Sequence, residues 1–149
     1  MTSRREQFVD ASAELTGFPR VQLFGTGMSD KYLQALDEIL SVEVVDEFLA
    51  LCTRAADTSG NAGVSGIVQH ASWGPIARNI IILWYCGTWT ALPDAWRAVH
   101  GTAPTDLDHV VSAEAYQMGL QWVAAGAHPA GARQQGFGAW AISPAETVS

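Results

Sequence analysis

The most constraining feature of this sequence is the apolar run Ile80–Tyr85, in which all six consecutive residues are aliphatic or aromatic. Pro75 precedes it, and proline is favoured in the first turn of a helix, where its missing N–H group costs least. The segment from Pro75 to Thr88 is too long for a typical strand. A helix that is apolar on every side has to be buried. We therefore expect this segment to be the central helix, with a strand of a parallel sheet as the alternative.

The N-terminal half predicts three amphipathic helices from apolar residues at helical spacing. The first begins after Ser3, which has capping-box spacing with Glu6, and ends near Gly17. The second runs from about residue 30 to residue 40, with Ser29 as its expected N-cap. The third spans roughly residues 44–56. Its predicted buried stripe contains Val45, Phe48, Leu49, Cys52 and Ala56.

The C-terminal half is expected to be less regular. Ser112 is predicted to cap a last helix that continues to about Ala125. The segments 18–27 and 92–107 contain proline and glycine and are predicted to be irregular, and the Gly- and Ser-rich segment 58–66 is predicted to be a connection. Beyond the last helix, glycine and proline are too frequent for a helix or a central strand.

These patterns predict an all-α fold with two parts. Residues 1–127 are expected to form a small bundle of four to five helices around the central helix at about 75–89. Residues 128–149 are expected to form a long non-helical arm. A chain of 149 residues is long enough for one domain with one modest core.

Composition and charge exclude several classes of partner. The formal net charge is -7, with eight basic residues scattered among fifteen acidic ones, so no nucleic-acid partner is expected. The longest apolar stretch, Ile80–Leu92, is shorter than the ~20 residues that a membrane helix needs. Cys52 and Cys86 lack metal spacing and are interpreted as two buried free thiols, although the sequence leaves a disulfide open.

The turn Gly25-Thr26-Gly27 raises the question of a dinucleotide site, because it follows an apolar run and precedes a helix. Asp30 occupies the place of the third glycine. Its carboxylate would face phosphate at the helix N-terminus, where the amide groups favour negative charge from the ligand. We therefore expect this chain to bind no nucleotide cofactor.

The densest cluster of titratable side chains contains Asp106, Asp108, His109 and Glu114. Such a set could bind a metal ion, but the same residues suit a solvated turn before the last helix, which we prefer. The cluster supports one alternative function, a stand-alone enzyme or small-molecule-binding protein that uses Asp108, His109, Glu114 and Tyr116. We otherwise expect no catalytic, cofactor-binding or metal-binding residue in this chain.

The C-terminal segment holds Phe137 and Trp140 among glycines, so it is unable to bury them by its own folding. Either the helices of the same chain, a second copy of the chain or a different partner has to cover them. We favour a partner protein. The expected partner-binding residues are Tyr116, Trp122, His128, Pro129, Arg133, Phe137 and Trp140.

Two blocks of the sequence carry a resemblance to a known family. The first is Trp84-Tyr85-Cys86-Gly87, and the second comprises the segments 112–116, 119–122, 126–133 and 136–140. With an early Leu15-Thr16-Gly17, these blocks resemble the small (gamma) subunit family of FAD-dependent sorbitol, fructose and glucose dehydrogenases. The two blocks cover about a third of the chain.

The resemblance implies a non-catalytic small subunit. Its partner would be a large subunit of the glucose-methanol-choline oxidoreductase type, which carries FAD and the catalytic histidine, and a cytochrome c subunit is a further possible partner. The small subunit would help the flavoprotein to fold and would stabilise it. Family members commonly begin with a twin-arginine leader, whereas this chain starts its first amphipathic helix at once. We therefore expect a cytoplasmic location, with a periplasmic one as the alternative if a leader is missing.

Overall fold

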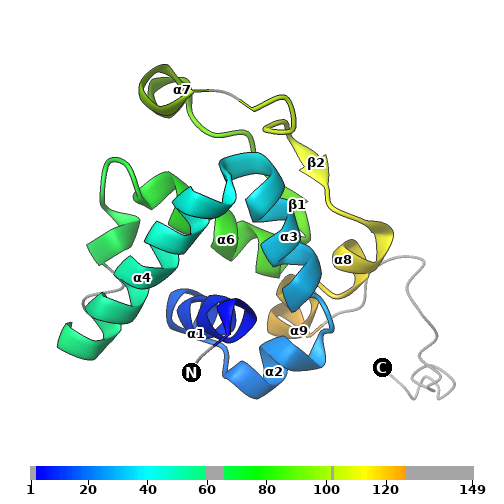
Figure 1. The fold of residues 1–149 in the computed structure, drawn as a ribbon. Coiled ribbons are helices and arrows are strands. Elements are labelled where there is room, and N and C mark those ends of the chain that lie inside the picture. Colours follow the sequence, from blue (N-terminus) through cyan, green and yellow to red (C-terminus); the bar gives the residue numbers. More distant parts are fainter. Residues whose placement is uncertain (1–2, 60–65, 102, 127–149) are drawn as a thin grey trace, which may run out of the picture.

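The computed structural model describes residues 3–59, 66–101 and 103–126, and the fold of these ranges is almost entirely helical, as predicted (Figure 1). The expected arm at 128–149 lies outside the described residues. The helices are α1 Arg4–Thr16, α2 Arg20–Gly25, α3 Ser29–Leu40, α4 Val42–Ser59, α6 Gly74–Cys86, α7 Asp94–His100, α8 Ala113–Gln117 and α9 Leu120–Ala125. Two short strands, β1 Thr88–Trp89 and β2 His109–Val110, pair in antiparallel orientation.

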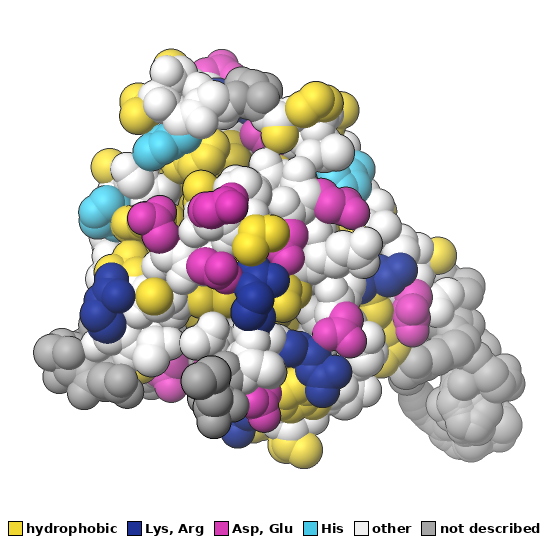
Figure 2. All heavy atoms as spheres, viewed as in Figure 1, with side chains coloured by type: hydrophobic (Ala, Val, Ile, Leu, Met, Phe, Trp, Pro, Cys, Tyr) yellow, Lys and Arg dark blue, Asp and Glu magenta, His cyan; other side chains and the backbone are white. Residues whose placement is uncertain are grey.

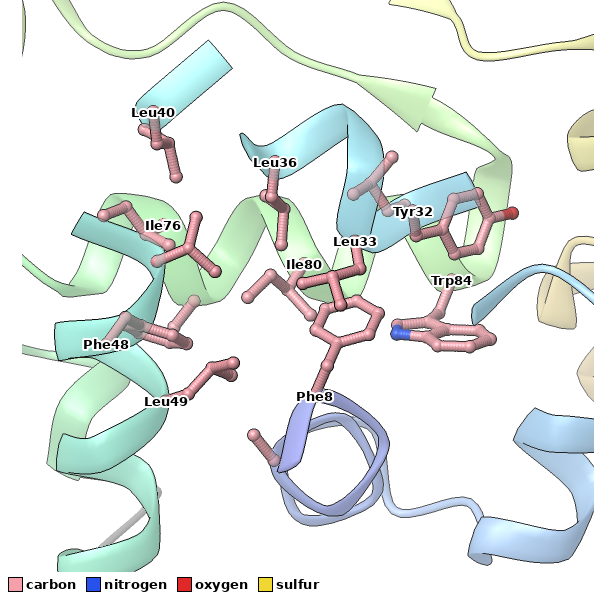
Figure 3. Packing of buried hydrophobic residues seen from close by; sticks show 14 of the residues in the cluster. Phe8, Tyr32, Leu33, Leu36, Leu40, Phe48, Leu49, Ile76, Ile80 and Trp84 are labelled. Carbon is pink, nitrogen blue, oxygen red and sulfur yellow. The ribbon is translucent and has the colours of Figure 1, made fainter. Parts of the chain in front are cut away.

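Helix α6 is the central helix, which confirms the expectation from its apolar run. It packs against α1 and α9, and α3 and α4 pack on α1 in turn (Figure 1). The Trp84 ring is 1% exposed and stacks on Phe8 of α1 with ring centroids 5.9 Å apart. Tyr32 of α3 meets the same indole edge-on at 4.9 Å, so one tryptophan joins three helices (Figure 3).

The start and end of α1 follow the sequence signals closely. The Ser3 hydroxyl accepts a hydrogen bond from the Glu6 amide at 3.1 Å, and the Glu6 carboxylate accepts one from the Ser3 amide at 3.1 Å. The capping box is therefore confirmed. Gly17 ends the helix with a φ of 81°, in the left-handed region that glycine adopts without strain.

The predicted stripe of α4 is confirmed at four of its positions, because Val45, Phe48, Leu49 and Cys52 are each no more than 2% exposed. Ala56 is half-buried. The helix itself is longer than predicted and includes residues 42–43 and 57–59. Both cysteines are free thiols, as expected, although Cys86 is only half-buried.

An ion-pair cluster connects the first helix to the next two long helices. The Arg4 guanidinium donates two hydrogen bonds to the Asp37 carboxylate, at 2.8 and 2.9 Å, and a third to Asp46 at 2.6 Å. These two carboxylates raise the pKa of Arg4 above its usual value, since they favour its charged form. Arg4 therefore holds α1 against α3 and α4 at their solvent-facing side.

Two segments predicted to be irregular are helical. Pro19 lies at the N-cap of α2, where its fixed φ suits the entry into a helix, and the chain is helical from residue 20 to residue 25. Pro93 has the same position before α7, which covers residues 94–100. Both helices are too short to show an apolar stripe, so proline was the main sequence signal. It was interpreted as a sign of irregular structure, whereas here it precedes the first turn of a helix.

One predicted helix cap and the predicted length of the last helix need correction, whereas the other cap is confirmed. Ser29 is the first residue of α3 rather than its N-cap, and the Thr26 hydroxyl accepts a hydrogen bond from the Met28 amide just before it. Ser112 does cap α8, by accepting from the Ala115 amide at 3.0 Å. The single last helix predicted to reach Ala125 is interrupted at residues 118–119 and forms two short helices.

No helix among the described residues is long and apolar enough to cross a membrane, in agreement with the shortness of the apolar run.

The Tyr32 hydroxyl is buried in the core without a hydrogen-bond partner among the described residues, and burial raises the pKa of this phenol above its usual range. An unpaired buried hydroxyl costs about 1–3 kcal/mol of desolvation. We predict that Tyr32→Phe raises the free energy of unfolding by up to about 1 kcal/mol in urea denaturation. Tyr85→Phe is the matched control, because the Tyr85 hydroxyl does donate, to the Thr16 carbonyl at 3.5 Å. A loss of stability in Tyr32→Phe would contradict the prediction.

Burial raises the pKa of the Cys52 thiol from 9.0 to about 12. The folded chain therefore keeps this thiol protonated while the unfolded chain ionises it, so the stabilisation is complete below about pH 9 and is lost as the pH rises toward 12. The loss is up to about 1.4 kcal/mol per pH unit. We predict that urea unfolding shows a shallower alkaline decline in Cys52→Ala than in the unaltered protein. Parallel pH profiles would be inconsistent with this origin.

Candidate functional site

The two blocks that carry the resemblance are far apart in the sequence but pack directly against each other at the end of α6. Gly87 ends α6 with a φ of 68°, and a Cβ atom there would lie 2.5 Å from the Ala115 backbone of α8. Gly119, at the N-cap of α9, is as close to the first block, since its Cβ would lie 2.5 Å from the Tyr85 carbonyl oxygen. Each glycine therefore permits a backbone approach that any other residue would block.

Hydrogen bonds reinforce this contact. The Val111 amide donates to the Gly87 carbonyl at 2.8 Å, just before the Ser112 cap. The Cys86 thiol lies 4.0 Å from the Gln121 side-chain oxygen of α9. The pair β1–β2 continues the contact, with Thr88 opposite Val110. The end of α6 and the start of the second block thus form one structural unit.

The early Leu15-Thr16-Gly17 element reaches the same place. The Tyr85 hydroxyl donates to the Thr16 carbonyl at 3.5 Å, and the Tyr85 ring meets Phe18 edge-on with centroids 5.7 Å apart. The Leu15–Gly17 element and the described parts of both blocks therefore meet around Tyr85. Sequence reasoning missed this convergence, because nothing in the spacing of these elements relates residue 16 to residue 85 or residue 119.

The structure brings together the two predicted partner-binding residues that it describes. Tyr116 of α8 and Trp122 of α9 are half-buried, and their rings meet edge-on at 5.5 Å. The Trp122 indole also donates to the Tyr116 carbonyl at 2.9 Å, which fixes α8 against α9. Val123 is next to this pair in sequence and is 60% exposed. The other predicted partner-binding residues, His128, Pro129, Arg133, Phe137 and Trp140, lie outside the described residues.

Two residues of the predicted polar cluster, Asp106 and Asp108, have structural roles. Asp106 is 2% exposed and accepts hydrogen bonds from the Trp89 indole at 2.8 Å and from the Leu92 amide at 3.0 Å. Its second carboxylate oxygen pairs with the Arg97 guanidinium at 3.0 Å. Asp108 accepts from the Ala91 amide at 2.6 Å. Both carboxylates hold the segment that carries α7 in place.

The remaining members of the alternative site are spread over neighbouring elements. His109 lies in β2 with its Nδ1 atom 2.6 Å from the Leu107 carbonyl oxygen. Glu114 is exposed in the first turn of α8, where its negative charge interacts favourably with the positive end of the helix dipole. Within the described ranges, no group of three or more His, Cys, Asp and Glu side chains is placed to hold a metal ion.

Comparisons of the chain with protein-family models, with curated proteins and with solved structures find no match.

The close approach at the two glycines generates a stability prediction. Gly119→Ala should lower the free energy of unfolding by about 1–3 kcal/mol, because the added methyl group overlaps the Tyr85 carbonyl oxygen. Gly87→Ala should lower the free energy of unfolding at least as much, because alanine would also be strained by the left-handed φ at this position. Gly25→Ala is the control, because no atom lies within 4 Å of its added Cβ. Equal stabilities of all three variants in urea denaturation would refute the assigned role of this contact.

Proposed function

We propose that this chain is the non-catalytic small subunit of a heteromeric FAD-dependent dehydrogenase of the glucose-methanol-choline type, which oxidises a sugar, polyol or glycoside hydroxyl. FAD belongs to the large subunit in this proposal, and the small subunit stabilises that flavoprotein and helps it to fold. A cytochrome c subunit is a further proposed partner. The proposed location is the cytoplasm, or the periplasm with the partner if a leader precedes this chain.

The observation that carries the proposal is that the Leu15–Gly17 element and the two resembling blocks meet at Tyr85. Here Thr16, Gly87 and Gly119 all take part in contacts at the end of α6. These contacts place the described parts of the resembling segments side by side, which supports the proposal.

The place of this unit at the end of the described chain suggests how it would serve a partner. α8 and α9 carry Tyr116 and Trp122 with part of each ring accessible, and α9 leads directly into the segment that contains Phe137 and Trp140. Aromatic side chains of this kind are frequent anchors in protein interfaces. An obligate interface would bury more than ~2,000 Å² in total.

Co-expression with a candidate large subunit tests the proposal. The tagged chain should co-purify with a flavoprotein that contains bound FAD and oxidises a sugar or polyol with an artificial electron acceptor. Trp140→Ala should lower the yield of the complex by at least about tenfold, the loss expected for a central aromatic anchor. His109→Ala, on the described surface in β2, should leave the yield unchanged.

Two outcomes would contradict the proposal. One is a stable chain that remains a monomer when a flavoprotein partner is present at high concentration. The other is an equal yield of complex from Trp140→Ala and from the unaltered protein, which would remove the C-terminal aromatic residues from the interface.

A further inference from the structure

A groove of about 400 Å³ lies between the α3–α4 junction, the start of α6 and α7. Its lining is mainly apolar and aromatic and includes Leu40, Ile76, Leu92, Trp73 and Trp96. Hydrophobic side chains and histidine are visible together beneath α7 in Figure 2. A volume of this size and an apolar lining with few polar groups are typical of small-molecule sites.

The two tryptophans of the groove are held in fixed orientations. The Trp96 indole donates to the Ser72 carbonyl at 2.8 Å, and its ring lies 4.5 Å from that of His100. The Trp73 ring packs on Phe48 with centroids 5.9 Å apart. Both indoles are half-buried, so each keeps part of its surface open. Pre-oriented aromatic surfaces lower the entropic cost of binding a ligand.

The segment that carries Trp73 is itself braced. The His70 Nδ1 atom accepts hydrogen bonds from the Ser72 amide at 3.0 Å and from the Trp73 amide at 3.2 Å. The same nitrogen thus fixes the turn before α6. The turn before α6 is therefore held both by His70 and, through the Ser72 carbonyl, by Trp96 of α7.

The titratable side chains that line the groove are two carboxylates and one histidine, His100. Asp106 lines it, but the Arg97 guanidinium neutralises that carboxylate at 3.0 Å. Glu47 of α4 also lines it, is exposed, and has no ion pair or hydrogen bond among the described residues. No lysine or arginine lines the groove, and the whole chain has a net charge of -7. A cationic ligand would therefore gain an opposite charge at Glu47 without displacing an existing partner.

We propose that this groove binds a small organic cation, an ammonium or quaternary ammonium compound with an apolar or aromatic body. The apolar body lies against Ile76 and Leu92, the positive charge lies against the indole faces of Trp73 and Trp96, and Glu47 supplies the counter-charge. Cations are attracted to the electron-rich face of an indole, and quaternary ammonium groups are bound in this way by aromatic cages. The proposal does not depend on the assembly of this chain with a flavoprotein.

Isothermal titration of the full chain with benzyltrimethylammonium at low ionic strength tests the proposal. Benzyl alcohol and phenylacetate are the neutral and anionic comparators with the same ring. We expect saturable binding of the cation, weaker binding of the alcohol and no binding of the anion. Glu47→Gln should weaken binding of the cation about five- to tenfold, and Trp96→Leu should weaken it by a similar factor.

Glu14→Gln is the matched control, because it makes the same change in net charge on the exposed side of α1, outside the groove lining. It should leave the affinity within about twofold, and circular dichroism should show that all three variants keep their helical content. Absence of binding, equal binding of cation and anion, or an equal loss in Glu14→Gln would each overturn the proposal. Because the titration contains only this chain, its result is separate from that of the co-purification.

Discussion

The close backbone contact at the C-terminal end of α6 is the constraint on which the rest of the structure depends. Gly87 and Gly119 let α8 and α9 approach α6 to distances at which a Cβ atom would overlap a carbonyl group. While α9 packs on α6, Trp84 of the same helix packs on Phe8 of α1 and Tyr32 of α3. One helix is thereby enclosed by elements from both ends of the described chain.

The sequence predicted the long helices well, because their signals are local. The Ser3 capping box, the buried stripe of α4 and the apolar run of α6 each follow from side-chain spacing alone. The short helices α2 and α7 were missed, since six or seven residues are too few to display a stripe. The break at residues 118–119 was missed for another reason, because it is associated with a contact distant in sequence: a Cβ atom on Gly119 would lie 2.5 Å from the Tyr85 carbonyl oxygen.

The candidate sites were predictable only in part. Tyr116 and Trp122 were both expected to bind a partner, which stays a prediction, and the structure adds that their rings meet edge-on with centroids 5.5 Å apart. The groove was not predicted, because α7 is positioned by the bonds of Asp106 to Trp89, Leu92 and Arg97. Those partners lie 9 to 17 residues away, at separations that correspond to no helical or strand period.

If this chain assembles with a flavoprotein as proposed, α8, α9 and the residues that follow them should form the interface. Hydrogen–deuterium exchange of the chain, alone and in complex with that partner, tests this claim most directly. We expect the partner to slow exchange in residues 113–125 and in the C-terminal residues that follow, and to leave exchange in α4 unchanged. Slower exchange confined to α4, or no difference in residues 113–125, would contradict it.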